Sequence, residues 1–173
     1  MGLVHIYCGE GKGKTTCSVG LAVRFAATGK KVLFYQFMKN QKSGERSVLE
    51  TIPEIEVYRG YEMPKFSFAM NEEEKNEAKS VYESEFEKIK KLSDSGKYGM
   101  IILDEIMSCI SCGFLDSSAV ADFIRDKEKN PEIVMTGRNP APELCELADY
   151  ISEIQKIKHP FDRNIKAREG VEF

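Results

Sequence analysis

The feature of the sequence that points most directly to chemistry is the run GEGKGKTT at residues 9–16. Glycines at 9, 11 and 13 allow backbone conformations that are closed to other residues, so that main-chain N–H groups can turn toward phosphate oxygens. Lys14 can then reach the terminal phosphates of a nucleotide, and the Thr15 hydroxyl can bind Mg²⁺. The run therefore predicts a loop that binds a nucleoside triphosphate through Gly9, Glu10, Gly11, Lys12, Gly13, Lys14, Thr15 and Thr16.

The spacing of this run differs by one residue from the usual phosphate-binding pattern, because Cys8 stands where a glycine is expected five residues before Gly13. A glycine-rich turn with incidental lysines is the alternative interpretation. A second motif favours the nucleotide. Leu103, Asp104 and Glu105 end an apolar run, and an acid at the carboxyl end of a buried strand can bind a metal through its water shell. We therefore expect Mg²⁺ (or Mn²⁺) to be held by Thr15, Asp104 and Glu105.

The elements that must position these residues follow from hydrophobic periodicity. Short apolar runs alternate with helical patterns, which is typical of βαβ units on a parallel sheet. We expect a polar loop at 40–46, strands at 3–8, 31–38, 55–58, 100–103, 132–135 and 150–157, and helices at 16–28, 71–92, 117–128 and 143–148. The expected fold is α/β: a single P-loop NTPase-like (RecA-like) domain over residues 1–173, with a mostly parallel sheet and helices on both faces.

Composition restricts the class of protein. The chain has 173 residues, of which 42% are hydrophobic and 31% charged, and these values are close to globular averages. A net charge of −3 argues against nucleic-acid binding by bulk charge. No apolar run approaches the roughly 18 to 20 residues of a membrane span, and the N-terminus does not resemble a secretory signal. We therefore expect a cytoplasmic protein with no membrane or nucleic-acid partner.

The five cysteines predict no disulfide framework, since they are scattered among apolar residues. Cys109 and Cys112 have the spacing of zinc ligands, but the two histidines, His5 and His159, are distant in sequence. Two small buried side chains on a helix are the simpler interpretation.

Other candidate residues have two interpretations each. Arg24 is either a solvated charge on the helix after the loop or a nucleotide contact. Arg138 follows a strand at its carboxyl end and either faces the phosphates or points away. Phe66 and Phe68 form core plugs or a hydrophobic lid, and the basic, aromatic tail that includes Lys158 and His159 is either functional or a plain C-terminal extension.

Taken together, the motifs resemble a known family, the ATP:corrinoid adenosyltransferases that act on cob(I)alamin and cob(I)yrinic acid a,c-diamide. The resemblance extends from about residue 3 to Glu172. It is carried in order by GEGKGKTT at 9–16, Gln36–Lys39, Leu103–Glu105, Thr136–Arg138, Ala148–Asp149 and Lys158–Phe161. The late glycine of the loop is then a trait of the family.

The resemblance implies a specific reaction. Co(I) of the corrinoid would attack the 5′ carbon of ATP and expel the whole triphosphate, so that no protein base is needed. Lys14, Lys12, the loop amides and Mg²⁺ on Thr15 would neutralise the leaving group. Phe66 and Phe68 match the segment that displaces the lower ligand of Co(II), where many relatives carry Trp at the second position.

The resemblance also implies partners and further contacts. Arg24, Arg138, Lys158 and His159 complete the expected substrate-binding set, and the tail at about 158–173 would close over the site. An electron-donating reductase and a homodimer are implied as well. Two alternatives stay open: a small-molecule kinase on a thymidine-kinase-like core, and a nucleotide-gated binding protein or switch.

Overall fold

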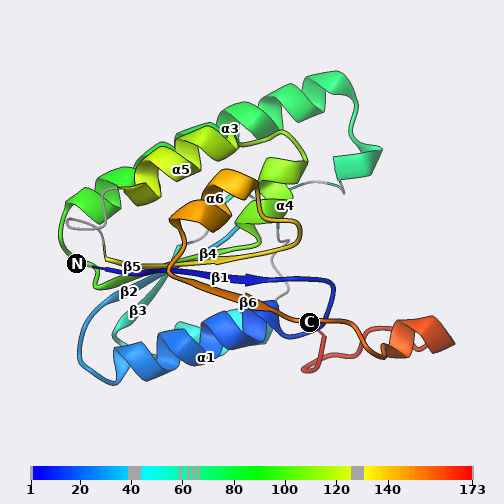
Figure 1. The fold of residues 1–173 in the computed structure, drawn as a ribbon, viewed down its shortest axis with the longest axis horizontal. Helices are drawn as coiled ribbons and strands as arrows, with labels where there is room; N and C mark the ends of the chain where they lie inside the picture. Colours follow the sequence, from blue (N-terminus) through cyan, green and yellow to red (C-terminus); the bar gives the residue numbers. More distant parts are fainter. Residues whose placement is uncertain are drawn as a thin grey trace.

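Six parallel strands form one sheet in the order β3-β2-β4-β5-β1-β6, which is central in Figure 1. The strands are β1 (Val4–Cys8), β2 (Val32–Gln36), β3 (Ile55–Tyr58), β4 (Met100–Asp104), β5 (Glu132–Thr136) and β6 (Tyr150–Glu153). All five residues of β2 and of β4 are buried, as expected for inner strands covered on both faces. The structure is a computed structural model that describes residues 2–38, 44–58, 60, 61, 63, 65, 67–125 and 131–172.

Helices cover both faces of the sheet (Figure 1). The helices are α1 (Lys14–Ala26), α2 (Gly44–Leu49), α3 (Glu72–Asp94), α4 (Ile106–Ser111), α5 (Ser117–Arg125) and α6 (Pro142–Leu147), with short 3-10 turns η1 (Ser67–Ala69) and η2 (Pro160–Arg163). On one face, α1 turns Ser18, Ala22 and Ala26 inward at four-residue spacing. The opposite face is covered by α3, α4, α5 and α6.

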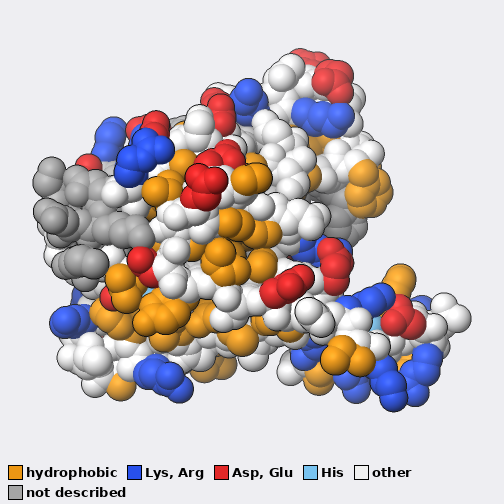
Figure 2. All heavy atoms as spheres, viewed as in Figure 1, with side chains coloured by type: hydrophobic (Ala, Val, Ile, Leu, Met, Phe, Trp, Pro, Cys, Tyr) orange, Lys and Arg blue, Asp and Glu red, His pale blue; other side chains and the backbone are white. Residues whose placement is uncertain are grey.

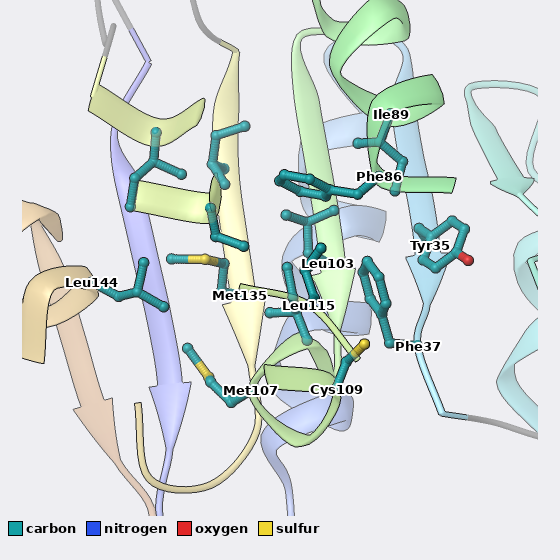
Figure 3. Close-up of a cluster of buried hydrophobic side chains, with 14 of the residues drawn as sticks. Tyr35, Phe37, Phe86, Ile89, Leu103, Met107, Cys109, Leu115, Met135 and Leu144 are labelled. Carbon is teal, nitrogen blue, oxygen red and sulfur yellow. The ribbon is translucent and has the colours of Figure 1, made fainter. Parts of the chain in front are cut away.

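The core is divided by the sheet, because successive side chains of a strand point to opposite faces. In β2, Val32 and Phe34 pack toward α1, whereas Leu33 and Tyr35 pack toward α3 and α4. Figure 3 shows the larger of the two clusters, in which side chains of β2, β4 and β5 meet those of the covering helices, Phe86 among them. The two packed layers hold the carboxyl ends of the inner strands at one edge of the sheet.

The predicted fold class is confirmed, with strands at all six expected places. The last strand is shorter than expected. It ends at Glu153, where the chain turns to contact the glycine-rich loop through Ile154. The expected polar loop at 40–46 is wrong in part, since α2 begins at Gly44, while residues 40–43 and 126–128 lie outside the described residues. Helix α4 includes Cys109, in agreement with the helix expected around Cys109 and Cys112.

The Cys109 and Cys112 pair differs from its predicted pattern of two buried side chains. Cys109 is buried in α4, and burial raises the pKa of its thiol, but Cys112 is exposed at the end of that helix. Among the described residues, no group of three or more His, Cys, Asp or Glu side chains is arranged to hold a metal. In the same part of the chain, every helix is too short or too polar to cross a membrane.

Candidate functional site

A cavity of about 660 Å³ lies at the carboxyl edge of the sheet, where β1 leads into α1. Its walls come from the glycine-rich loop, the first turns of α1 and α2, the end of β4 and the C-terminal tail. The lining residues are Glu10, Gly11, Lys12, Gly13, Lys14, Thr15, Thr16, Val19, Gly44, Glu45, Val48, Glu105, Arg138, His159, Gly170, Val171 and Glu172.

The loop after β1 needs glycine for two separate reasons. Gly13 precedes α1 with φ of 120°, a conformation that side chains strongly disfavour. Gly11 donates its N–H to the carbonyl of Ile154 at 2.7 Å, and a Cβ on Gly11 would meet that same oxygen at 2.7 Å. The loop is therefore packed directly against the backbone that follows β6.

Lys14 is the first residue of α1 and is almost buried, with 8% of its surface exposed. Its ammonium group donates hydrogen bonds to the carbonyls of Gly9 at 2.8 Å and Gly11 at 2.9 Å. No side chain of the described residues caps the start of this helix, so the positive end of α1 faces the cavity together with the ammonium group. These features favour a polyanion in the cavity.

Asp104 ends β4 and is fully buried. One carboxylate oxygen accepts a hydrogen bond from the Thr136 hydroxyl at 2.7 Å. The other accepts from the Thr15 hydroxyl at 3.2 Å and from the Gln36 amide at 3.2 Å. The structure thus brings together Thr15 and Asp104, two of the three residues predicted to bind the metal.

Glu105, the third of these residues, lines the cavity, but its carboxylate is hydrogen-bonded within α4 and not to Thr15 or Asp104. It lies at the start of α4 with φ of 60°, and its N–H donates to the Thr136 hydroxyl at 2.8 Å. Its carboxylate accepts a hydrogen bond from Ser108 at 2.7 Å. Glu105 is therefore beside Asp104 in the chain, but its side chain is engaged with α4.

Arg138 lines the cavity, which agrees with the first of the two placements expected from the sequence, facing the phosphates. It follows Gly137 after β5 and forms an ion pair with Glu10 of the loop at 3.0 Å, with both side chains more than half exposed. Because the pair is accessible to solvent, a phosphate group can compete with Glu10 for the guanidinium group.

The tail contributes part of the cavity wall through His159 and residues 170–172. Arg168 pairs with Glu172 at 3.0 Å, and this hydrogen-bonded pair lowers the pKa of Glu172 to about 2, with Lys12 adding to the effect. Lys158 is exposed and does not line the cavity. In Figure 2, Lys and Arg side chains gather on the projecting lobe that Figure 1 identifies as the tail.

Like Lys158, Arg24 and Phe68 are not brought to this cavity. Arg24 is exposed in the last turn of α1, about 15 Å along the helix from Lys14. Phe68 lies in η1 and is 85% exposed, away from the cavity lining. Phe66 lies outside the described residues.

Sequence reasoning missed several residues of the site. Thr136 and Gln36 stood in motifs that carried the resemblance, but no role was assigned to either. Val19, Glu45 and Val48 were not singled out at all, although they line the cavity. The sequence did contain a signal that Gln36 belongs to the site, because Gln36 is a polar residue at the end of an apolar strand, at the same edge of the sheet as Asp104.

Comparison with known proteins gives a consistent result over the whole chain. Residues 1–173 match the model of a family described as ATP:corrinoid adenosyltransferase BtuR/CobO/CobP. A corrinoid adenosyltransferase of Sinorhizobium sp is 33% identical over 174 residues, covering 99% of this chain and 80% of the relative. The corrinoid adenosyltransferases of Pseudomonas aeruginosa and Escherichia coli K12 are 31% and 28% identical, each over 99% of this chain and over 84% and 86% of the relative.

Proposed function

Since the chain belongs to the ATP:corrinoid adenosyltransferase family, we propose that it transfers the 5′-deoxyadenosyl group of ATP to Co(I) of a corrinoid, either cobalamin or cobyrinic acid a,c-diamide. The observation that carries the proposal is that Lys14 and Thr15 line one cavity, with Asp104 buried behind Thr15, in a chain that matches the family from end to end. The product would be the adenosylated corrinoid, and triphosphate would be released.

The bond changes balance without a protein base. The electron pair of Co(I) forms the bond to the 5′ carbon, the C–O bond at that carbon breaks, and the triphosphate leaves with the electron pair of the broken bond. The task of the chain is to stabilise the negative charge on the departing oxygen. Loop N–H groups, Lys12 and Lys14 meet this requirement, with Lys14 exchanging the carbonyls of Gly9 and Gly11 for phosphate oxygens.

A divalent cation, Mg²⁺ or Mn²⁺, is part of the proposal. Thr15 and Asp104 provide oxygen ligands of the kind that such ions prefer, and their side chains lie within hydrogen-bond distance of each other. When bound, the ion would neutralise charge on the phosphates. Thr15 would hold it directly and Asp104 through water, with the neighbouring Glu105 close enough in the chain to contribute.

The corrinoid would lie beside the ribose end of ATP, under a cover formed by Phe66, Phe68 and the tail at about 158–173. The proposal is supported by the exposure of Phe68, whose apolar ring is 85% accessible to solvent and so available to a ligand. Such a ring would exclude water from cobalt and offer it no ligand. Phe68 would take the place of the Trp found in many relatives.

Three wider features belong to the same proposal. An electron-donating reductase would supply Co(I), the enzyme would act as a homodimer, and the reaction would take place in the cytoplasm.

Arg24 would contact a part of the nucleotide that extends beyond the cavity described above. Lys158 and His159 would contact the corrinoid, and His159 is the better placed because it lines the cavity.

The deciding experiment is anaerobic incubation with ATP, Mg²⁺ and chemically reduced cobalamin or cobyrinic acid a,c-diamide. We expect the spectrum of an adenosylated corrinoid and one intact triphosphate for each turnover. ADP as the product would indicate a kinase and refute the proposal. Nucleotide binding without consumption of either substrate would indicate a switch, which refutes it as well.

A further inference from the structure

Gln36 occupies an unusual position between two acidic residues. It is the last residue of β2, it pairs in register with Asp104 of β4, and it is 2% exposed. Its amide nitrogen donates to Asp104 Oδ2 at 3.2 Å and to Glu45 Oε1 at 2.8 Å. Because both neighbours are carboxylate oxygens, the nitrogen of the amide must be the atom that faces them.

Packing alone does not explain a glutamine here. The amide oxygen, Oε1, is buried and has no hydrogen-bond partner among the residues that the structure describes, which costs free energy that an apolar side chain would avoid. The other four residues of β2 are Val, Leu, Phe and Tyr, so the strand otherwise follows the pattern of a buried core strand. What Gln36 provides in return is one amide group that joins two carboxylates from different elements.

The two carboxylates have different positions relative to the cavity. Asp104 is fully buried, and the oxygen that accepts from Gln36 also accepts from Thr15 at the end of the glycine-rich loop. Glu45 lies in the first turn of α2 and lines the cavity. The amide of Gln36 therefore connects the acid beside Thr15 with a helix that forms a wall of the cavity.

We propose that Gln36 is a positioning residue for the metal-bound nucleotide. It holds the Asp104 carboxylate in the orientation that meets Thr15, and through Glu45 it fixes the α2 wall relative to that carboxylate. The inference rests on the proposed function for the identity of the ligand, ATP with a divalent cation. It adds Gln36 and Glu45, to which neither motif nor comparison assigns a role.

The test is to measure ATP binding by calorimetry with and without Mn²⁺, and bound Mn²⁺ by electron paramagnetic resonance, in the absence of corrinoid. The measured quantity is the gain in ATP affinity that Mn²⁺ gives. Gln36→Met has similar volume and removes both donated hydrogen bonds. We expect it to reduce this gain about tenfold, the size of effect that loss of hydrogen bonds to charged groups produces.

Glu45→Ala tests the second half of the inference. It should reduce the gain about threefold, consistent with the loss of one hydrogen bond. Because both residues act through one amide, the double variant should lose no more than Gln36→Met alone. If the losses of the two single variants multiply in the double variant, the proposed link between Glu45 and Gln36 is refuted.

Controls separate positioning from general effects. Glu50→Ala removes an exposed acid just after α2 that does not line the cavity, and it should leave the gain unchanged. Because Glu50→Ala and Glu45→Ala remove the same charge, an equal loss in both would reduce the Glu45 result to an effect of net charge and overturn the Glu45 half of the proposal. If Gln36→Met folds and the gain in ATP affinity is unchanged, the proposal is overturned. If Gln36→Met does not fold, an unchanged gain in Glu45→Ala overturns it instead. Failure of adenosyl transfer with the binding results as expected would refute the proposed function alone.

Discussion

Replacing Gly11 with alanine is the sharpest test of how the glycine-rich loop is held. A Cβ at Gly11 would lie 2.7 Å from the carbonyl oxygen of Ile154 and 2.8 Å from that of Gln155. Both are backbone atoms, so no side-chain rotation can relieve the overlap. Moving the two segments apart to an ordinary contact of 3.4 Å would lengthen the Gly11 N–H to Ile154 hydrogen bond from 2.7 Å toward its limit.

The expected cost combines two effects. Forcing an extra carbon into a packed contact costs about 1–3 kcal/mol, and loss of one hydrogen bond costs about 1 kcal/mol. We therefore expect Gly11→Ala to cost about 2–4 kcal/mol. The cost lowers the free energy of unfolding if the loop stays in place, and it lowers the affinity for ATP if the loop moves away from Ile154. Urea denaturation and calorimetric titration with ATP measure the two terms separately.

A matched substitution in the same region gives the control. Gly20 lies exposed in the middle of α1, and a Cβ there would meet no atom of the described residues within 4 Å. Gly20→Ala should therefore stabilise the protein by about 0.5–1 kcal/mol, because alanine favours helix. If Gly11→Ala changed unfolding and ATP affinity by less than about 0.5 kcal/mol in total, the range of an ordinary surface substitution, the close approach to Ile154 would be irrelevant to the loop.

Three further predictions concern single side chains. Lys14→Ala should slow adenosyl transfer about 30- to 1000-fold, equivalent to about 2–4 kcal/mol of leaving-group stabilisation, and near-normal turnover under saturating ATP would contradict its role. Asn71→Ala should lower the free energy of unfolding in urea by about 1 kcal/mol, because Asn71 forms the capping box that starts α3; an unchanged midpoint would disprove this. Arg168→Ala should raise the pKa of Glu172 from about 2 toward its ordinary value of 4.5, as measured by NMR titration. Since the folded pKa is the lower one, the contribution of this pair to stability is present above pH 4.5 and is lost as the pH falls through 2; a pKa that stays at 2 in the variant would exclude Arg168 as the cause.

The positions that sequence could predict are those set by local pattern. GEGKGKTT between a strand and a helix predicts that Lys14 and Thr15 lie close to the start of that helix, and an apolar run that ends in Asp104 puts that acid at the carboxyl edge of a parallel sheet. Parallel strands all present their carboxyl ends at the same edge, so the two motifs predict that Thr15 and Asp104 lie at one edge, where the structure brings them into contact.

The positions that sequence could not predict depend on which strands are neighbours. Gln36 gains its role only because β2 lies beside β4, an arrangement that local pattern does not determine. The first three residues of α2 were predicted as part of a loop, because a helix of six residues is too short to show a helical period. Arg24 lies on a correctly predicted helix, but at its far end.

The placement of β1 between β5 and β6 has a consequence for synthesis of the protein. The N–H of Val4 donates to the carboxylate of Asp149, a residue 145 positions later, and Gly11 is held by Ile154 beyond it. Strand β1 is thus enclosed only after β5 and β6 have been made, because both of its neighbours follow it by more than 120 residues in the chain. A nascent chain that stops short of residue 154 would carry the complete GEGKGKTT run and still lack the backbone that holds it in shape.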